Sequence, residues 1–376
     1  MAEKQVLVIC GEPSGDLHAA TLVTAINKID HRIKFYAVGG DLLAHAGAEI
    51  IYDIKGLSVM GLFDVIKNLP RFFLLKRKIF DKLALHKFNA VIFVDFSGFN
   101  LRLAKEMNHK IPTIYYVSPQ VWASRTGRVK TIKRYIDRLI VLFKFEEDFY
   151  RKHGVNALFA GHPLLDIVKP KLAKHDLLTK HGLSESKTTI ALLPGSRKQE
   201  ITRILPIMLE SARLINKELP AQFIIAKSAN LEWKQYEIIL RESGVSAKII
   251  DGQAYDCVNA ADFCLVCSGT ATLETAIMEK PLAVIYKTSA LNYFLYRPQI
   301  KLPYIGMVNI VAGKQIAPEF IQFNATAKKI SQGVLKILRD KDGLEKMKRD
   351  LSAIKPLLGE SGASARAAKI VLDFLK

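Results

Sequence analysis

The stretch from residue 262 to 279 most constrains the fold of this chain. An apolar run at Phe263–Cys267 has the length and composition of a buried parallel strand, and it leads through Ser268, Gly269 and Thr270 into a run of good helix formers. A helix that starts on small residues presents unpaired N–H groups and a positive dipole end, which together attract phosphate. An ordinary turn with a Ser or Thr cap explains the same pattern, so both interpretations stay open here.

The same order of strand, loop and helix recurs along the chain. Apolar strand patterns fall at residues 5–10, 33–38, 90–95, 112–117 and 139–143, and again at 189–193, 222–226, 248–251, 263–267 and 282–286. Between the two sets, residues 169–187 are Lys-rich with few periodic apolar positions, which is typical of a domain junction. This alternation predicts an α/β protein of two Rossmann-like domains that face each other across a central ligand cleft. We expect domains at residues 1–165 and 166–356.

The net charge of the chain points to an anionic partner. Lys and Arg number 55 against 36 Asp and Glu, which gives +19. Nucleic acid, an anionic membrane or a phosphorylated substrate fits this charge. No apolar run reaches the roughly 18 residues that a membrane span needs, and the N-terminus lacks a signal-peptide pattern. With only four cysteines, we expect a cytoplasmic protein.

Three acidic residues in the first half follow predicted strands. Glu12 and Asp16 lie in a Gly-containing loop after the first strand, and Asp95 ends the strand at residues 90–95. In open α/β sheets, ligands bind at the carboxyl ends of the strands, which makes all three candidates for a site. Turn and cap roles explain Glu12 and Asp16 equally well. Asp95, a carboxylate directly at a strand end, is the stronger catalytic candidate.

A second turn of phosphate-binding type follows the strand at residues 189–193. It has the sequence Pro-Gly-Ser-Arg, and Arg197 in it has the geometry to hold a diphosphate through paired hydrogen bonds. Glu274 lies one turn into the helix after Thr270, where a carboxylate reaches a ribose hydroxyl. The only D-x-D pair, at residues 340–342, lies in a charged helical region and is interpreted as surface. We therefore expect no metal site. If a diphosphate is the leaving group of a reaction, N–H groups and Arg must balance its negative charge.

Residues 61–82 mix apolar and basic side chains more densely than one narrow core stripe needs. Leu69, Phe72, Phe73 and Leu75 are interleaved with cations that include Arg71 and Lys76. This mixture is typical of a helix that lies on an anionic membrane surface. A core helix with a solvated basic face is the alternative. A second basic segment, after Arg125, could face phosphates, lipid head groups or water.

Several segments, taken in order, resemble one family, the lipid-A-disaccharide synthases, which are two-domain glycosyltransferases of the GT-B type. The matching segments are Gly11–Asp16, Ser58–Gly61, Asp95, Tyr116–Pro119 with Val121–Ala123, Gly161–His162, Leu192–Arg197, Ser268–Ala271 with Leu273–Glu274, and Asn309 with Ala312–Gly313. They run from residue 11 to 313, which is most of the chain. No single segment is decisive, but the ordered set is specific.

The resemblance implies a reaction. Such enzymes transfer a diacylglucosamine from its UDP carrier to the 6-hydroxyl of a diacylglucosamine 1-phosphate, with inversion, and release UDP and a β-1,6 disaccharide. It implies no metal and no cofactor, peripheral attachment to the inner membrane from the cytoplasmic side, and no nucleic-acid partner. It also implies a possible homodimer, in which a C-terminal helix at about residues 357–376 either packs back on its own chain or exchanges.

The resemblance also assigns roles to residues. It implies an acceptor- and membrane-binding N-terminal domain and a UDP-sugar-binding C-terminal domain. The expected catalytic residues are Asp95 as base, Arg197 and Glu12; the UDP contacts are Ser196, Arg197, Ser268, Gly269, Thr270, Glu274 and Asn309; the acceptor or membrane contacts are Ser14, Asp16, Met60, Leu69, Arg71, Phe72, Phe73, Leu75 and Lys76. The family often has a second Asp three residues after the first, and this chain has Gly98 there. Asp95 is therefore the sole base candidate in its loop.

Two other functions compete with this one. A UDP-sugar 2-epimerase shares the expected architecture but has no need for the apolar and basic stretch. A nucleic-acid-binding protein would explain the charge of +19, but the sequence has no recognisable RNA- or DNA-binding module.

Overall fold

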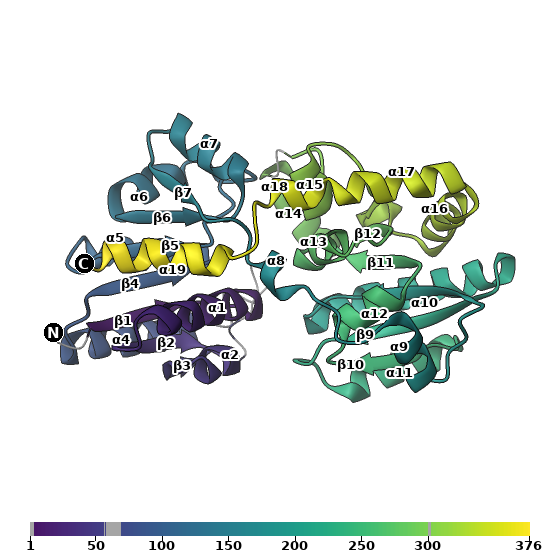
Figure 1. Cartoon of the computed structure of the whole chain (residues 1–376), viewed down its shortest axis with the longest axis horizontal. Coiled ribbons are helices and arrows are strands. Elements are labelled where there is room, and N and C mark those ends of the chain that lie inside the picture. The colour runs from purple at the N-terminus through teal and green to yellow at the C-terminus, as the bar shows by residue number, and fades with distance from the viewer. Residues whose placement is uncertain (1–3, 56, 58–68, 300–301) are drawn as a thin grey trace. The chain divides into compact units, whose positions relative to one another are not determined.

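The computed structural model describes residues 4–55, 57, 69–299 and 302–376, and the chain divides into two compact units (Figure 1). The N-terminal unit contains the residues up to Asp166 and those from Leu358 onward, and the C-terminal unit contains most of the chain between them. Both ends of the chain therefore belong to the N-terminal unit. Each unit has one parallel sheet whose strands alternate with helices.

The N-terminal unit is built on seven parallel strands in the order β3-β2-β1-β4-β5-β6-β7. Its elements are β1 (Lys4–Ile9), α1 (Pro13–Ile29), β2 (Ile33–Gly39), α2 (Asp41–His45), β3 (Glu49–Asp53), α4 (Leu69–Leu85), β4 (Ala90–Val94), α5 (Ser97–Met107), β5 (Thr113–Tyr116), α6 (Arg128–Tyr135), β6 (Arg138–Val141), α7 (Lys144–Lys152), β7 (Ala157–Phe159), α8 (Leu164–Ile167) and, from the C-terminus, α19 (Ala363–Phe374). The central strand β1 pairs with β2 on one side and β4 on the other, so that Val6 lies between Phe35 and Ala90.

The C-terminal unit is built on six parallel strands in the order β10-β9-β8-β11-β12-β13. Its elements are α9 (Lys174–Lys180), β8 (Thr188–Leu193), α10 (Lys198–Glu218), β9 (Ala221–Lys227), α11 (Trp233–Ser243), β10 (Lys248–Asp251), α12 (Ala254–Ala260), β11 (Phe263–Cys267), α13 (Thr270–Ile277), β12 (Leu282–Tyr286), α14 (Ala290–Tyr296), the 3₁₀ turn η1 (Arg297–Gln299), α15 (Met307–Ala312), β13 (Glu319–Ile321), the 3₁₀ turn η2 (Gln322–Asn324), α16 (Ala327–Arg339), α17 (Lys341–Ser352) and α18 (Ile354–Leu357).

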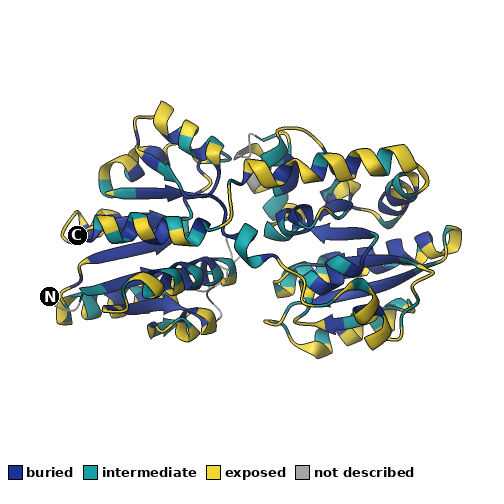
Figure 2. Cartoon of the chain, in the orientation of Figure 1, coloured by how far each residue is buried: buried dark blue, intermediate teal, exposed yellow. Residues whose placement is uncertain are grey.

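The central strands are apolar along their whole length because both faces of each sheet are covered. Every residue of β4 and of β11 is buried, while the outer faces of the helices are exposed (Figure 2). A strand buried on both faces has no polar alternation, which is why these strands stand out in the sequence as continuous apolar runs.

The strand order reverses once in each sheet, and this positions the candidate site. In the N-terminal sheet, β2 and β3 lie beyond β1 on one side, and β5, β6 and β7 lie beyond β4 on the other. In the C-terminal sheet, β9 and β10 lie beyond β8, and β12 and β13 lie beyond β11. Ligands of open α/β sheets bind beside the carboxyl ends of the two strands at such a switch point. The loops that follow β1, β4, β8 and β11 are the loops that the sequence singled out.

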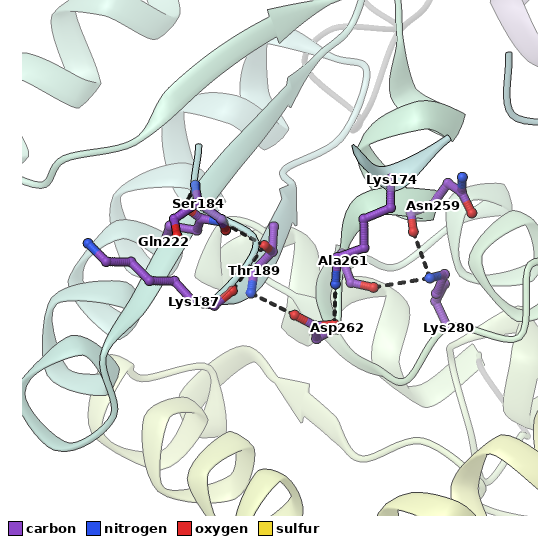
Figure 3. Close-up of polar contacts among 9 residues, drawn as sticks. All are labelled: Lys174, Ser184, Lys187, Thr189, Gln222, Asn259, Ala261, Asp262 and Lys280. Atoms are coloured by element: carbon purple, nitrogen blue, oxygen red, sulfur yellow. Dashed lines mark hydrogen bonds and ion pairs between the residues drawn. The ribbon is translucent and has the colours of Figure 1, made fainter. Parts of the chain in front are cut away.

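At the amino ends of the strands of the C-terminal sheet, polar side chains form hydrogen bonds with other groups of the protein (Figure 3). The Asp262 carboxylate accepts hydrogen bonds from Thr189 N at 2.8 Å and Lys174 Nζ at 2.6 Å, and Gln222 Nε2 donates to Thr189 Oγ1 at 2.9 Å. Nearby, Lys280 Nζ donates to the Asn259 carbonyl at 2.6 Å. The amino ends of β8 and β11 are therefore fastened structurally, and we assign this edge no ligand.

The C-terminal helix α19 packs along α1 of its own chain. Arg366 fastens its start by donating from Nε to the Ala160 carbonyl at 2.9 Å, and Gly362 N donates to Asp166 Oδ1 at 2.6 Å. Upstream, His162 N donates to the Leu358 carbonyl at 2.9 Å. An exchanged dimer would have to reproduce these contacts between two chains, and the dimer itself stays a prediction.

Two buried histidines predict that acid destabilises the N-terminal unit. The rings of His18 and His162 meet edge to face with 5.9 Å between centroids. Burial lowers the pKa of His18 to about 4, and burial together with the charge of His18 lowers the pKa of His162 well below its usual value. Because both folded pKa values lie below the unfolded value of about 6.5, the unfolded chain takes up protons first. Stability should be full above about pH 6.5 and fall as the pH drops toward 4.

Thermal melting between pH 7.5 and 4.5 measures this loss. The Nδ1 atom of His18 is buried and has no hydrogen-bond partner among the described residues, so His18→Leu removes a titrating group without breaking a bond to Nδ1. We expect this variant to show a shallower pH dependence, by up to about 1.4 kcal/mol per pH unit for one proton. An equal pH dependence of stability in His18→Leu and in the wild type would exclude His18 as a source of the acid sensitivity.

Candidate functional site

The loops after β1 and β4 touch each other at Gly11. A Cβ atom added to Gly11 would lie 2.3 Å from Cγ of Phe96, so only glycine leaves room for the Phe96 ring. Helix α1 begins at Pro13, because Pro fits the first helical position, so Asp16 lies in its first turn and not in a loop as predicted. Glu12 is consequently the N-cap residue of α1, and Ser14 lies in its first turn. Both remain candidates by position.

Asp16, which we predicted to contact the acceptor, has a structural role in the N-terminal unit. Its side chain is buried, and its two carboxylate oxygens accept hydrogen bonds from Gly40 N at 2.7 Å and Leu42 N at 3.1 Å. Burial raises the pKa of Asp16, and these backbone bonds lower it. The carboxylate therefore fastens α2 and the end of β2 to the start of α1.

Asp95 lies at a strained point among the carboxyl ends of the strands. Asp95 and Phe96 both have φ of 48°, a left-handed conformation that is unusual for residues other than glycine. The Asp95 carbonyl accepts hydrogen bonds from the Tyr115 hydroxyl and from Asn100 Nδ2, the latter at 2.9 Å. Since strain of this kind persists only where neighbours enforce it, and clusters at active sites, it favours a functional Asp95.

The next loop along the sheet, after β5, is strained and anchored in the same way. Val117 has φ of 61°, which is costly for a β-branched residue. The buried carboxylate of Glu146 at the start of α7 accepts hydrogen bonds from Ser118 Oγ at 2.8 Å and Trp122 Nε1 at 3.0 Å. Burial raises the pKa of Glu146, and these bonds lower it. Ser118 and Trp122 of the family motif are thus held by Glu146, which lies in a charged segment that gave no sequence signal.

In the C-terminal unit, Glu200 organises the turn that carries Arg197. Its Oε2 accepts hydrogen bonds from Ser196 N at 2.9 Å and Arg197 N at 3.2 Å, and its Oε1 accepts one from Arg197 Nη1 at 3.0 Å. Gly195, at φ of 113°, makes room for this carboxylate, which would lie 2.3 Å from an added Cβ. The Ser196 N–H predicted to bind diphosphate therefore already has an acceptor. Sequence reasoning missed Glu200, although its spacing from Arg197 is that of a capping box.

The turn after β11 is anchored by Ser268 and open at Gly269. Ser268 N donates to the Ile285 carbonyl at 2.8 Å, and Ser268 Oγ donates to the Ile305 carbonyl at 2.9 Å. The Ser268 N–H is thus unavailable for UDP, in contrast to the prediction. Gly269 is exposed with open space around it, and α13 starts at Thr270. Of the residues predicted to contact the diphosphate in this turn, Gly269 and Thr270 remain candidates.

Glu274 lies one turn into α13 and contacts α12. Its Oε1 accepts a hydrogen bond from the Tyr255 hydroxyl at 3.2 Å. Burial raises the pKa of Glu274, and the bond from Tyr255 lowers it. Tyr255 thus orients the carboxylate that we predict to bind the ribose.

Asn309, which we predicted to contact the donor, has a structural role in the C-terminal unit. Its side chain is 0% exposed. Nδ2 donates to the Ala317 carbonyl and to Glu319 Oε1, both at 2.8 Å, while Oδ1 accepts from Ile316 N and Ala317 N. All four hydrogen-bonding positions of an asparagine amide are therefore filled by its own chain. Asn309 ties α15 to the start of β13.

Helix α4 corrects one part of the predicted membrane surface. Leu69 and Phe73 are 42% and 67% exposed, as a membrane-facing surface requires, but Leu75 is 0% exposed. The prediction for Leu75 was wrong because helical spacing places Leu75 with Ile79 on the face that packs inward. Phe72 is half-buried and contacts the Phe96 ring in a tilted arrangement, with 6.0 Å between centroids.

The other residues that we predicted to contact the membrane neither support nor contradict that prediction. Lys76 Nζ pairs with Glu106 Oε2 at 2.6 Å, and Arg71 lies in the first turn of α4. Met60 and the rest of the segment at residues 58–68 lie outside the described residues. None of the described helices combines the length and apolar character that crossing a bilayer takes.

Metal-binding groups do not gather anywhere in the described ranges. No three His, Cys, Asp or Glu side chains there are placed to share an ion. Asp340, from the D-x-D pair, caps α17 by accepting a hydrogen bond from Gly343 N at 2.9 Å.

Comparison with solved structures defines the class of fold. The chain superposes over 99% of its length on UDP-GlcNAc 2-epimerase from Neisseria meningitidis bound to UDP-GlcNAc, with a TM-score of 0.62 at 14% identity, and covers 99% of that chain. It superposes over 100% of its length on CalG4, the calicheamicin glycosyltransferase, with a TM-score of 0.58 at 14% identity, and covers 99% of that chain. The fold is therefore the two-domain GT-B fold of glycosyltransferases and these epimerases, as predicted.

Sequence comparison identifies the family within this class. The family model described as lipid-A-disaccharide synthetase matches residues 6–373. The lipid-A-disaccharide synthase of Syntrophus aciditrophicus is 43% identical over 100% of this chain and 99% of that protein, and the one of Myxococcus xanthus is 38% identical over 99% and 97%. The chain belongs to the lipid-A-disaccharide synthase family and is a glycosyltransferase of lipid A biosynthesis. The epimerase and nucleic-acid alternatives are not favoured.

Proposed function

We propose that this protein transfers a diacylglucosamine from UDP to the 6-hydroxyl of a diacylglucosamine 1-phosphate, and forms a β-1,6 disaccharide with inversion. Family membership supports the reaction class. The observation that carries the residue assignment is the strand order, because the predicted base and the predicted diphosphate turns all follow strands at the two switch points.

The C-terminal unit binds the UDP-sugar donor in this proposal. UDP-containing structures among the solved neighbours, such as the S. aureus MnaA–UDP co-structure, support a UDP-sugar donor. The N–H groups of Gly269 and Thr270 at the start of α13 and the Arg197 guanidinium hold the diphosphate, and Glu274 holds the ribose. Glu200, paired with Arg197, keeps the guanidinium in position before UDP arrives.

The N-terminal unit binds the acceptor and supplies the base. The Asp95 carboxylate takes the proton from the 6-hydroxyl as that oxygen attacks the anomeric carbon, and Glu12 on the neighbouring loop assists in positioning. The positive end of α13 and Arg197 offset the charge that develops on departing UDP. The exposed face of α4 attaches the protein to an anionic membrane, where both lipid substrates reside.

Assaying the purified protein with UDP-2,3-diacylglucosamine and 2,3-diacylglucosamine 1-phosphate tests the proposal most directly. Disaccharide and UDP should form in equal amounts. Release of UDP together with a 2-epimerised sugar, and no disaccharide, would establish the epimerase alternative instead.

Arg197→Ala should weaken UDP binding and slow turnover. It removes a charge-assisted hydrogen bond to the diphosphate, which corresponds to about 10- to 100-fold. Arg197→Lys should recover only part of this loss, because an ammonium group lacks the forked geometry. Titration calorimetry with UDP measures the affinity. Equal UDP affinity in the Ala variant and the wild type would remove Arg197 from the donor site.

Chelators should leave the activity unchanged, since the proposed mechanism meets the leaving-group charge with protein groups. Activity in excess EDTA, compared with activity after added Mg²⁺ or Mn²⁺, measures this. Inhibition by EDTA that either ion reverses would show that the mechanism needs a metal.

A further inference from the structure

An aromatic cluster lies on the surface of the C-terminal unit. It consists of Tyr293 and Phe294 from α14 and Phe323 from η2, whose rings contact one another with 5.8 to 6.1 Å between centroids. Phe294 and Phe323 are both 64% exposed, and Leu291, three residues before Phe294, is exposed as well. Single exposed apolar side chains are common on proteins, but a contiguous exposed group is typical of an interaction surface.

The two segments that carry the aromatic cluster are fastened to each other by a buried glutamine. Gln322 Oε1 accepts a hydrogen bond from Thr288 N at 3.0 Å, and Gln322 Nε2 donates to the Thr288 carbonyl at 3.1 Å. Thr288 lies between β12 and α14, and Gln322 begins η2 directly after β13. The fold therefore holds the exposed rings together at the carboxyl ends of the strands, where the proposed diphosphate turns also lie.

Cations outnumber acidic groups in the segment that carries the aromatic cluster. Residues 287–329 contain six Lys and Arg but only one acidic residue, Glu319. The Glu319 carboxylate is used within the unit, because its Oε1 accepts hydrogen bonds from Gly306 N at 2.9 Å and from Asn309 Nδ2 at 2.8 Å. The exposed rings thus belong to a strongly positive segment, which is complementary to an anionic surface.

Two of these cations lie where a positive charge does not stabilise the fold. Lys328 and Lys329 are exposed in the first turn of α16, and a cation at the amino end of a helix opposes the helix dipole. Lys329 Nζ donates a hydrogen bond at 2.6 Å to Oδ1 of Asn324, the residue after Phe323. Because helix stability disfavours both charges, an anionic partner outside the unit accounts better for their position.

We propose that the aromatic cluster, together with Lys328 and Lys329, binds the surface of an anionic lipid bilayer. Exposed apolar rings with cations close by are the combination that binds at the boundary between acyl chains and anionic head groups. The inference rests on the proposed function, in which the donor is a lipid of that bilayer, and it adds to the proposed attachment through α4 a contact in the donor-binding unit. This contact keeps the diphosphate turns close to the membrane that supplies the donor.

Sedimentation of the full chain with vesicles of phosphatidylglycerol and phosphatidylcholine tests the apolar part of this surface. Phe294→Ser combined with Phe323→Ser should weaken vesicle binding roughly 10- to 100-fold, because two rings no longer enter the bilayer. The melting temperature should change little, since both rings are mostly exposed. Ile238→Ser is the control. Ile238 is also exposed but lies on α11, between β9 and the far edge strand β10, and its change should alter binding by less than about twofold.

A second pair of variants tests the charge and leaves the rings in place. Lys328→Gln combined with Lys329→Gln should weaken binding to the same anionic vesicles roughly 10- to 30-fold, and should leave binding to vesicles of phosphatidylcholine alone within about twofold. Lys217→Gln combined with Lys336→Gln makes the same charge change at exposed positions in the last turns of α10 and α16. This control should bind both kinds of vesicle within about twofold of the wild type.

The outcomes separate this inference from other uses of the aromatic cluster and from the proposed function. Unchanged vesicle binding in both test variants, or no vesicle binding by the wild type, would overturn the inference. Lost self-association with unchanged vesicle binding would assign the cluster to a second copy of the chain. A raised KM for the donor in detergent micelles, again with unchanged vesicle binding, would assign the rings to the acyl chains of the donor. A wild type that binds vesicles through these residues and makes no disaccharide would overturn the proposed function and leave the membrane contact established.

Discussion

Asp95→Asn should abolish glycosyl transfer and leave UDP affinity close to that of the wild type. Removing a general base lowers turnover by roughly 10²–10⁴, because the base acts only in the chemical step. Asparagine keeps the shape of the side chain and tolerates the left-handed conformation that Asp95 adopts, so the strained turn should survive the change. Turnover is measured by disaccharide formation, and UDP affinity by calorimetry.

A matched control separates chemistry from folding. Asp16→Asn makes the same chemical change in the first turn of α1, where the carboxylate accepts two backbone hydrogen bonds. It should lower the melting temperature, because an amide nitrogen in place of one oxygen faces an N–H donor. Asp95→Asn should melt as the wild type does. Near-full turnover in the Asp95 variant would remove this residue from the mechanism.

The sequence predicted the central strands well and missed three edge strands. β1, β4, β8 and β11 are buried on both faces, and each appears as an apolar run within a residue or two of its observed bounds. The edge strands β3, β7 and β13 were not predicted, whereas the edge strand β10 was predicted at its observed bounds, Lys248–Asp251. Each of the three missed strands lies at the edge of its sheet, is short, and is only partly buried, so its side chains give no distinct apolar run.

The candidate site shows the same division between local and long-range information. Local spacing identified the loops that carry Asp95, Arg197 and Gly269, because a strand followed by small residues is a local pattern. The long-range partners of other motif residues were not predictable, because tertiary packing brings Glu146 to Ser118 and Tyr255 to Glu274.

Some predicted contacts proved to be structural for a related reason. A polar residue within a motif does not reveal whether its hydrogen bonds go to a ligand or to its own chain. The Asn309 side chain and the Ser268 N–H both bond to backbone groups of the same unit. Only the hydrogen bonds of the folded chain distinguish a ligand contact from a structural one.

Replacing the exposed apolar side chains of α4 with serine should release the protein from membranes without unfolding it. Leu69, Phe73 and Leu74 are 42%, 67% and 49% exposed, so they contribute little to the core. Each apolar side chain that enters a bilayer contributes up to about 1.5–3 kcal/mol, so the triple serine variant should bind anionic vesicles at least tenfold more weakly. Vesicle sedimentation measures the binding, and the melting temperature should change little.

Leu75→Ala is the control on the same helix, because Leu75 is 0% exposed and its truncation should cost about 2–5 kcal/mol of folding stability. Unchanged sedimentation of the triple variant would exclude this face of α4 from membrane binding, and a collapsed melting temperature would show that the three side chains belong to the core.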